Sequence, residues 1–480
     1  MNRLEHILWR FGMTQLKHTF CLALLGGIFA SAAQPARAAD QTVPGAGNPT
    51  AMALSSKSPM VQSAREFLLG QINNIGNATA RAATLDAVAN PQTCVTHRAG
   101  LTATGKQTIV QQLIAAGLVD TADGGTFPGG LIAGVFPPLL NDGSICPQLP
   151  QTFFSAPGSF FGGHHSWPGG LAVHESFNDV SNLNLARGYR RVYGQTGSNG
   201  LPVIGDESGE SAVFLSQDVT TAAPIWHDWA KPMVFQWNSD GSEFLELSIG
   251  GNGVSDNFGA PGNSKTGGHH TISVAEAMKR GLPPDLVVAV ATAHSHVTKD
   301  NEYKVVNWLH AAAIIAQIDP VAQGYLSLDA SGRLRLPPLR HLGEVNLNAA
   351  SPSQSNVLAE YPLHSISDGD FVCTEPAVSV DQVVLAILAP EYGFDPSQVA
   401  VYNNGFRNPV FSFLTAERLF IIYGNRGLDG VRSELNNLQA LGFLGASAGE
   451  SSQVRKGRNK QSARAPRLSR RGVTARAPTS

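Results

Sequence analysis

The segment Trp226-His227-Asp228-Trp229-Ala230-Lys231 places an imidazole, a carboxylate and an ammonium close together in the chain. On a helix, Lys231 would share a face with His227 and Asp228, because residues three and four apart are neighbours there. Imidazole and carboxylate together bind divalent cations, and a nearby ammonium accepts anionic charge. The segment therefore suits metal-assisted chemistry on phosphate. A single His-Asp pair also occurs as a helix cap or a surface hydrogen bond, so its interpretation as a metal site depends on the rest of the chain.

Histidines gather around this segment. Nine of the 14 histidines fall between residues 164 and 310, namely His164, His165, His174, His227, His269, His270, His294, His296 and His310. His164 and His165 precede a proline turn, so they either reach a metal or hydrogen-bond the loop. His294 and His296 are two residues apart and would not share a helical face, which leaves one of them as a direct ligand unless the helix ends there. His310 is interpreted as a packing residue, and Trp226 and Trp229 as core.

The elements that must position these residues are mainly helices. The apolar spacing and the turn residues predict them over residues 59–88, 102–119, 171–193, 211–231, 269–280, 284–297 and 303–318. The stretch 232–250 departs from this pattern, since two apolar runs flank Asn238-Ser239-Asp240-Gly241 and predict an inserted β-hairpin. After about residue 326, helices are expected near 378–388, 409–423 and 431–441. Asp368, Asp370 and Glu375 there are interpreted as a solvated acidic loop.

The N-terminus has the pattern of an export signal. Lys17 precedes an apolar run over residues 20–33, which is too short to span a membrane, and Ala36-Arg37-Ala38 suits cleavage. We expect a periplasmic or secreted protein without a membrane span in the mature chain. An oxidising compartment permits a disulfide between Cys94 and Cys146, with Cys373 left over.

These patterns divide the chain into six regions. They are a signal peptide (1–38), a linker (39–58), an N-terminal helical region (59–150), a metal-binding domain (151–325), a C-terminal helical extension (326–450) and a basic tail (451–480), expected to be disordered. The tail carries nine Lys and Arg residues and no acid, which leaves residues 39–450 with a net charge of −14. Nucleic-acid binding by this acidic body is disfavoured.

The order of these residues resembles the HD superfamily of metal-dependent phosphohydrolases, whose signature is His, then His-Asp, then Asp on successive helices. The run from His165 to Leu171, followed by His174, is similar to the His-x-aromatic-Pro-Gly-Gly-Leu opening of some HD domains. His-Asp-Trp-Ala-Lys is similar to the His-Asp-x-x-Lys of the family. The resemblance covers residues 160–325. No Gly-Tyr-Pro motif follows, which argues against the branch that degrades cyclic di-GMP.

The resemblance implies a mainly α fold with an HD-like helical core and helical extensions at both ends. It also implies the ligand set His174, His227, Asp228 and a late aspartate, either Asp319 or Asp300; Asp319 is preferred because it ends an apolar helix. His269 and His294 would hold a second metal, and Lys231, His270 and His296 would bind the substrate. Asp228 and Lys231 would take part in catalysis.

Two imidazoles and two carboxylates suit one or two ions of Mn, Fe, Co or Zn, which would activate a water for attack on phosphorus. We therefore expect an exported phosphohydrolase acting on a small phosphomonoester or phosphodiester. Two alternatives remain open, namely a non-catalytic metal-binding protein with a closed coordination shell and a diiron oxygenase on an HD-like scaffold. The substrate and the oligomeric state are not determined by the sequence.

Overall fold

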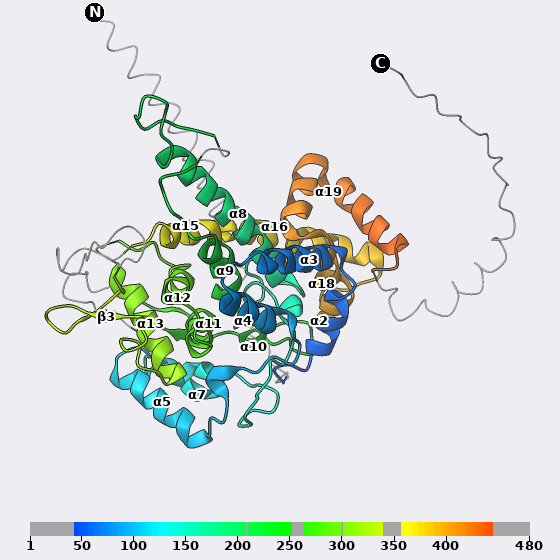
Figure 1. Cartoon of the computed structure of the whole chain (residues 1–480). Coiled ribbons are helices and arrows are strands. Elements are labelled where there is room, and N and C mark those ends of the chain that lie inside the picture. Colours follow the sequence, from blue (N-terminus) through cyan, green and yellow to red (C-terminus); the bar gives the residue numbers. More distant parts are fainter. Residues whose placement is uncertain (1–42, 207–209, 252–263, 299–300, 339–356, 445–480) are drawn as a thin grey trace, which may run out of the picture. The chain divides into compact units, whose positions relative to one another are not determined.

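A computed structural model describes residues 43–206, 210–251, 264–298, 301–338 and 357–444. The expected signal peptide, the basic tail and Asp300 lie outside these residues. Coiled ribbons make up most of the described chain (Figure 1). The described residues pack into one unit that begins at Val43. The expectation of a mainly α protein is confirmed.

The first helices lie between residues 48 and 135. They are α2 (Asn48–Ser55), α3 (Pro59–Asn73), α4 (Ala78–Ala89), α5 (Ala103–Ala115), α6 (Asp123–Thr126) and α7 (Gly130–Val135). Ser58 and Asn77 cap α3 and α4 by accepting hydrogen bonds from backbone N–H groups of the first turn. The helix expected over 59–88 is thus two helices, and α2 lies within the segment expected as a linker.

The central helices follow. They are α8 (Gly170–Tyr193), α9 (Gln217–His227), α10 (Lys231–Val234), α11 (Gly268–Lys279), α12 (Pro284–Ala291) and α13 (Glu302–Ala316). Helix α9 packs against α8, α11 and α12, and α11 packs against α13. Trp226 and Trp229 are fully buried, and their indole N–H groups donate to Thr84 Oγ1 and to Ala87 O of α4. The main hydrophobic core includes both tryptophans, as expected.

The strands are short. β1 (Ser248–Ile249) pairs antiparallel with β2 (Thr266–Gly267), and β3 (Ser327–Leu328) pairs antiparallel with β4 (Leu334–Arg335). The expected hairpin over 232–250 is wrong in its pairing. Its turn is present, but only the bridge between Trp237 and Glu243 forms, because Lys231–Val234 is helical and residues 248–249 pair with β2 instead.

The C-terminal helices are α15 (Glu360–Ser367), α16 (Phe371–Leu388), α17 (Val399–Tyr402), α18 (Asn408–Leu414) and α19 (Ala416–Ala440). Helix α15 packs against α8, α9 and α12, whereas α16 packs against α19 in a second hydrophobic cluster. Trp167, from the loop before α8, stacks on Phe411 within that cluster at 5.4 Å between ring centroids. The C-terminal region therefore contacts the segment that leads into α8.

One described stretch, Glu360–Tyr392, has the length and hydropathy of a membrane-crossing helix. It is interrupted by the 3₁₀ turn Asp368–Asp370, and its first part packs against three other helices. These features are those of a core segment, so the described chain offers no clear transmembrane span.

The expected disulfide between Cys94 and Cys146 is present, and Cys373 is a free, exposed thiol.

Candidate metal centre

Two histidines and two aspartates from three segments bring their side-chain atoms together. His174 lies in the second turn of α8, His227 and Asp228 end α9, and Asp368 begins the turn after α15. His174 Nε2 lies 3.4 Å from Asp228 Oδ2 and 3.2 Å from Asp368 Oδ1. His227 Nε2 lies 3.4 Å and 3.3 Å from the same two oxygens. Two imidazole nitrogens and two carboxylate oxygens thus surround one point.

The local backbone explains how α8 delivers His174. Gly169 adopts a left-handed conformation, with φ of 84°, directly before the helix. At Gly170 an added Cβ would overlap with His165 O, so the loop can approach the helix only because this residue is glycine. The two glycines of the Pro-Gly-Gly turn therefore fix the start of α8 and the position of His174.

A second group of ligand atoms shares Asp228. The other carboxylate oxygen, Asp228 Oδ1, lies 3.1 Å from His269 Nε2. Asp228, His269 and His294 offer ligand atoms that all lie within 4.8 Å of one another, and His227, His294 and Asp368 do the same. His294 is the most accessible of these side chains, with 26% exposed. Asp228 thus belongs to both groups, and Asp368 Oδ2 also lies 3.8 Å from His294 Nε2, so the two sets of ligand atoms adjoin one another.

Each histidine also has a polar neighbour at Nδ1, the ring nitrogen that faces away from Asp228 and Asp368. His227 Nδ1 lies 2.8 Å from Pro224 O, and because a carbonyl only accepts, Nδ1 carries a proton. His269 Nδ1 lies 2.6 Å from Glu246 Oε2, and His294 Nδ1 lies 2.8 Å from Thr266 Oγ1.

On α8, His174 Nδ1 lies 3.0 Å from Asp370 Oδ1. Metal-binding histidines typically have an outer hydrogen-bond partner, which fixes the ring and leaves Nε2 for the ion. His227, His269 and His294 follow this pattern.

Buried polar atoms test whether a metal fits. Among the described residues, Asp228 Oδ1, His227 Nε2 and His269 Nε2 are buried and have no hydrogen-bond partner. Such atoms are costly to bury unless something binds them. A divalent ion bound by imidazole nitrogen and carboxylate oxygen would satisfy all three, so the residues fit the expected cofactor.

The pKa values of the buried histidines and aspartates are also consistent with a metal site. Burial alone would lower the pKa of His227, but the carboxylates of Asp228, Glu175 and Asp368 raise it to about 9. Burial would raise the pKa values of Asp228 and Asp368, but neighbouring cations, His227 first, hold both well below their usual range. Without a metal these imidazoles keep protons that a cation can replace, so metal affinity should fall as the pH falls.

Glu175 is a member of the cluster that the sequence analysis missed. Its carboxylate is fully buried, and Oε2 lies 3.6 Å from His227 Nδ1. Burial raises its pKa to about 8. The only sequence signal was its place directly after His174.

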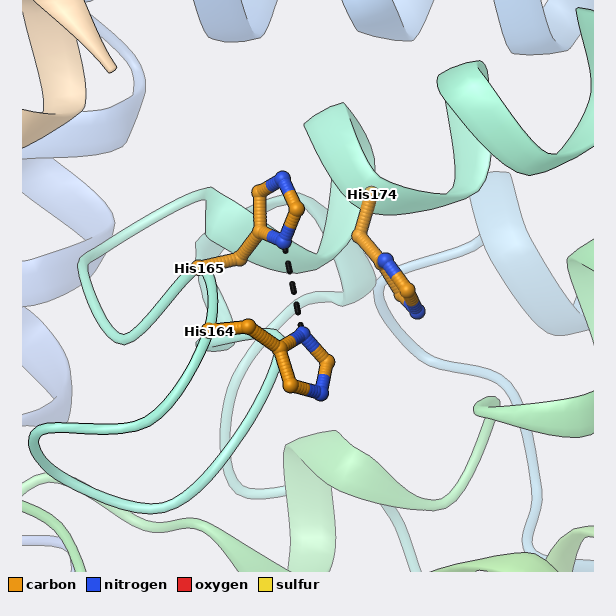
Figure 2. Close-up of side chains that lie close together, drawn as sticks. All are labelled: His164, His165 and His174. Carbon is orange, nitrogen blue, oxygen red and sulfur yellow. Dashed lines mark hydrogen bonds between the residues drawn. The ribbon is translucent and has the colours of Figure 1, made fainter. Parts of the chain in front are cut away.

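His164 and His165 lie on the loop before α8, and Figure 2 shows both beside His174. The Nδ1 atoms of His164 and His165 are 3.4 Å apart, and the His164 ring lies 4.9 Å from that of His174. His165 has a positive φ of 50°, and its Nε2 lies 2.9 Å from Glu417 Oε1 of α19. His165 thus connects the loop to the C-terminal region, whereas His164 faces the cavity described next.

A cavity of about 600 Å³ opens beside the two ligand groups. His174, Asp228, His269, His294 and Asp368 all line it. Lys231 and His296, the residues predicted to bind the substrate, line it as well. Lys231 Nζ donates to Asp228 Oδ2 and to Gly158 O. A small molecule in the cavity could therefore contact the carboxylates, the imidazoles and the ammonium together.

Two expected site residues lie elsewhere. Asp319 is exposed, accepts hydrogen bonds from the backbone N–H groups of Val321 and Ala322, and lines a different pocket. The structure does not bring Asp319, the preferred last ligand, to the other ligand residues, because it lies beyond the end of α13 and its carboxylate is bound by its own loop. The aspartate beside His174 and His227 is Asp368.

His270 does not line the cavity. It is buried, lies 3.1 Å from Ala291 O through Nε2, and stacks on the His294 ring at 4.2 Å. The structure therefore places it behind His294 rather than beside a substrate, because α11 turns adjacent residues toward different sides.

Comparisons of the chain with protein-family models, with curated proteins and with solved structures find no match.

Proposed function

We propose that the protein is a metal-dependent phosphohydrolase of the HD type that hydrolyses a phosphomonoester or phosphodiester outside the cytoplasm. The observation that carries the proposal is the meeting of His174, His227, Asp228 and Asp368 around one point, with His269 and His294 beside it. This set keeps the order His, His-Asp, Asp along the chain. Its last member differs from the one that the sequence suggested.

The ligand chemistry supports one or two ions of Mn, Fe, Co or Zn, which supply Lewis acidity and an activated water when bound. The residues of the chain supply the rest. The carboxylate of Asp228 can accept a proton from the attacking water. Lys231 and His296 line the cavity and can donate hydrogen bonds to phosphoryl oxygens, which gain charge in the transition state.

The cavity favours catalysis over the alternative of a closed, non-catalytic metal site. Asp228, Asp368 and His294 all line a space of about 600 Å³, which is large enough for a small phosphoester. A purely structural site would surround the ion with protein ligands and leave no open position.

The test combines metal content with turnover in matched variants. Wild type, Asp368→Asn and Asp319→Asn are purified, stripped with a chelator and refilled separately with Mn, Fe(II), Co or Zn. Metal per chain and hydrolysis of an aryl phosphate monoester and diester are then measured on the same samples.

We expect Asp368→Asn to lose metal and to lower hydrolysis at least 100-fold, while Asp319→Asn, the same change on an exposed carboxylate, keeps both. Bound metal without hydrolysis would refute the phosphohydrolase, and oxygen consumption by the iron form would favour the oxygenase. Equal metal loss in both variants would refute the assignment of Asp368.

A further inference from the structure

We propose, on the basis of the phosphohydrolase function above, that the substrate is an amphiphilic phosphoester whose apolar group lies on a wall formed by Ile366, Phe371 and Val372. The phosphate would face the metal centre and the apolar group would face the cavity mouth. We call these three residues the apolar wall.

The apolar wall is continuous with the metal centre. Its members line the same cavity as Asp368, and they flank that ligand along the chain at the junction of α15 and α16. They are also exposed, with 51%, 42% and 63% of the side chain accessible for Ile366, Phe371 and Val372. Covering such surface with an apolar group is favourable. A ligand whose phosphate is bound by a cation at Asp368 would therefore lie next to this wall.

The charge of the cavity argues against a polyphosphate. Among the described residues that line it, Lys231 is the only Lys or Arg, and it already donates to Asp228. Sites that bind nucleoside diphosphates or triphosphates normally supply several cations or a row of backbone N–H groups for the additional phosphates. A phosphodiester carries one negative charge and needs no such addition. The lining therefore suits one phosphate with an apolar substituent.

The reaction used for the test is hydrolysis of a p-nitrophenyl alkyl phosphate. Water forms a new P–O bond, the P–O bond to p-nitrophenolate breaks, and the alkyl phosphate remains. One proton of the water is released and the other remains on the alkyl phosphate monoanion. The leaving group is the same throughout the series, so only the alkyl chain varies.

We expect kcat/KM of the metal-loaded protein to rise about two- to fourfold per methylene from methyl to hexyl. Fourfold is the change that ~0.8 kcal/mol for a fully buried methylene gives, and twofold applies to half burial. Val372→Ser should reduce the hexyl-to-methyl ratio about fivefold. The matched control is Val383→Ser, the same change on the same helix at a side chain that is 60% exposed and outside the cavity lining, and it should leave the ratio unchanged.

Binding gives a second readout that does not depend on turnover. Hexylphosphonate and methylphosphonate are titrated into the metal-loaded protein by calorimetry, and hexylphosphonate should bind at least tenfold more tightly. Three results would each refute the proposed role of the apolar wall. They are a kcat/KM that does not change with alkyl length, equal effects of Val372→Ser and Val383→Ser, and tighter binding of a nucleoside monophosphate than of hexylphosphonate.

The outcomes separate the two proposals. Absence of hydrolysis for every ester refutes the phosphohydrolase function. The phosphonate titration would still show whether the apolar wall binds an alkyl group. Hydrolysis that does not depend on chain length supports the phosphohydrolase function and refutes the proposed role of the apolar wall. A long-chain diester presented below its micelle concentration, or in phosphatidylcholine vesicles, then shows whether the amphiphile comes from solution or from a bilayer.

Discussion

Replacement of Asp179 by Asn should stabilise the protein, increasingly so as the pH rises. Asp179 lies on α8, is fully buried, and neither carboxylate oxygen has a hydrogen-bond partner among the described residues. Burial alone raises its pKa from 3.8 to about 8. Asn has nearly the same shape and cannot ionise, so the substitution removes the cost of a buried charge.

The magnitude follows from the two pKa values. In the unfolded chain the carboxyl loses its proton near pH 4, whereas in the folded protein it keeps the proton until about pH 8. Between these values the folded state binds more protons, so the stability of the wild type falls as the pH rises, by up to ~1.4 kcal/mol per pH unit. From pH 5 to pH 8 the advantage of Asp179→Asn should therefore grow by about 3–4 kcal/mol.

The assay is urea unfolding of both proteins at pH 5, 6, 7 and 8 in the presence of a chelator, which removes the pH dependence of metal binding. The difference between the two curves isolates Asp179, because other buried carboxyls, such as Glu175 and Asp381, contribute equally to both proteins. Parallel stability curves would refute the reasoning, since they would mean that the Asp179 carboxylate is stabilised by a bound water or cation.

Two further predictions concern the metal centre and the disulfide. Glu246→Gln should weaken the binding of the metal held by His269 about 10- to 100-fold, because it removes the charge that orients the ring; Glu243→Gln, a buried carboxyl on the same loop, is the control, and competition with a chromophoric chelator is the measurement. Equal affinities for both variants would contradict this role. Replacing Cys94 and Cys146 by Ser should lower the free energy of unfolding by up to ~4 kcal/mol, since the disulfide closes a loop of 52 residues. Denaturation with and without reductant checks this, and an unchanged urea midpoint on reduction would count against it.

Much of the candidate centre could be anticipated because its residues sit in local patterns. His174 follows a Pro-Gly-Gly turn, His227 and Asp228 are adjacent, and His269 begins a helix after a glycine pair. In each case the signal lies within a few residues of the ligand. Most central helices were predictable for the same reason, since apolar spacing and capping residues are local.

Asp368 could not be found in this way. It sits in an acidic stretch that resembles a solvated loop, and nothing nearby in sequence marks it as a ligand. Its position depends on the packing of α15 against α8, α9 and α12, which is a property of the folded chain. Glu246 was missed for a related reason, since its contact with His269 depends on the pairing of β1 with β2 rather than on the hairpin that the sequence suggested.

The position of Asp368 also makes the candidate site depend on the C-terminal part of the chain. Every histidine of the two ligand groups lies at or before residue 294, but Asp368 follows only after α13 and the β3–β4 hairpin. A truncated chain that ends before α15 would keep the carboxylates of Asp228 and Glu175 but would lack Asp368. The candidate site is therefore complete only when the C-terminal helices have docked.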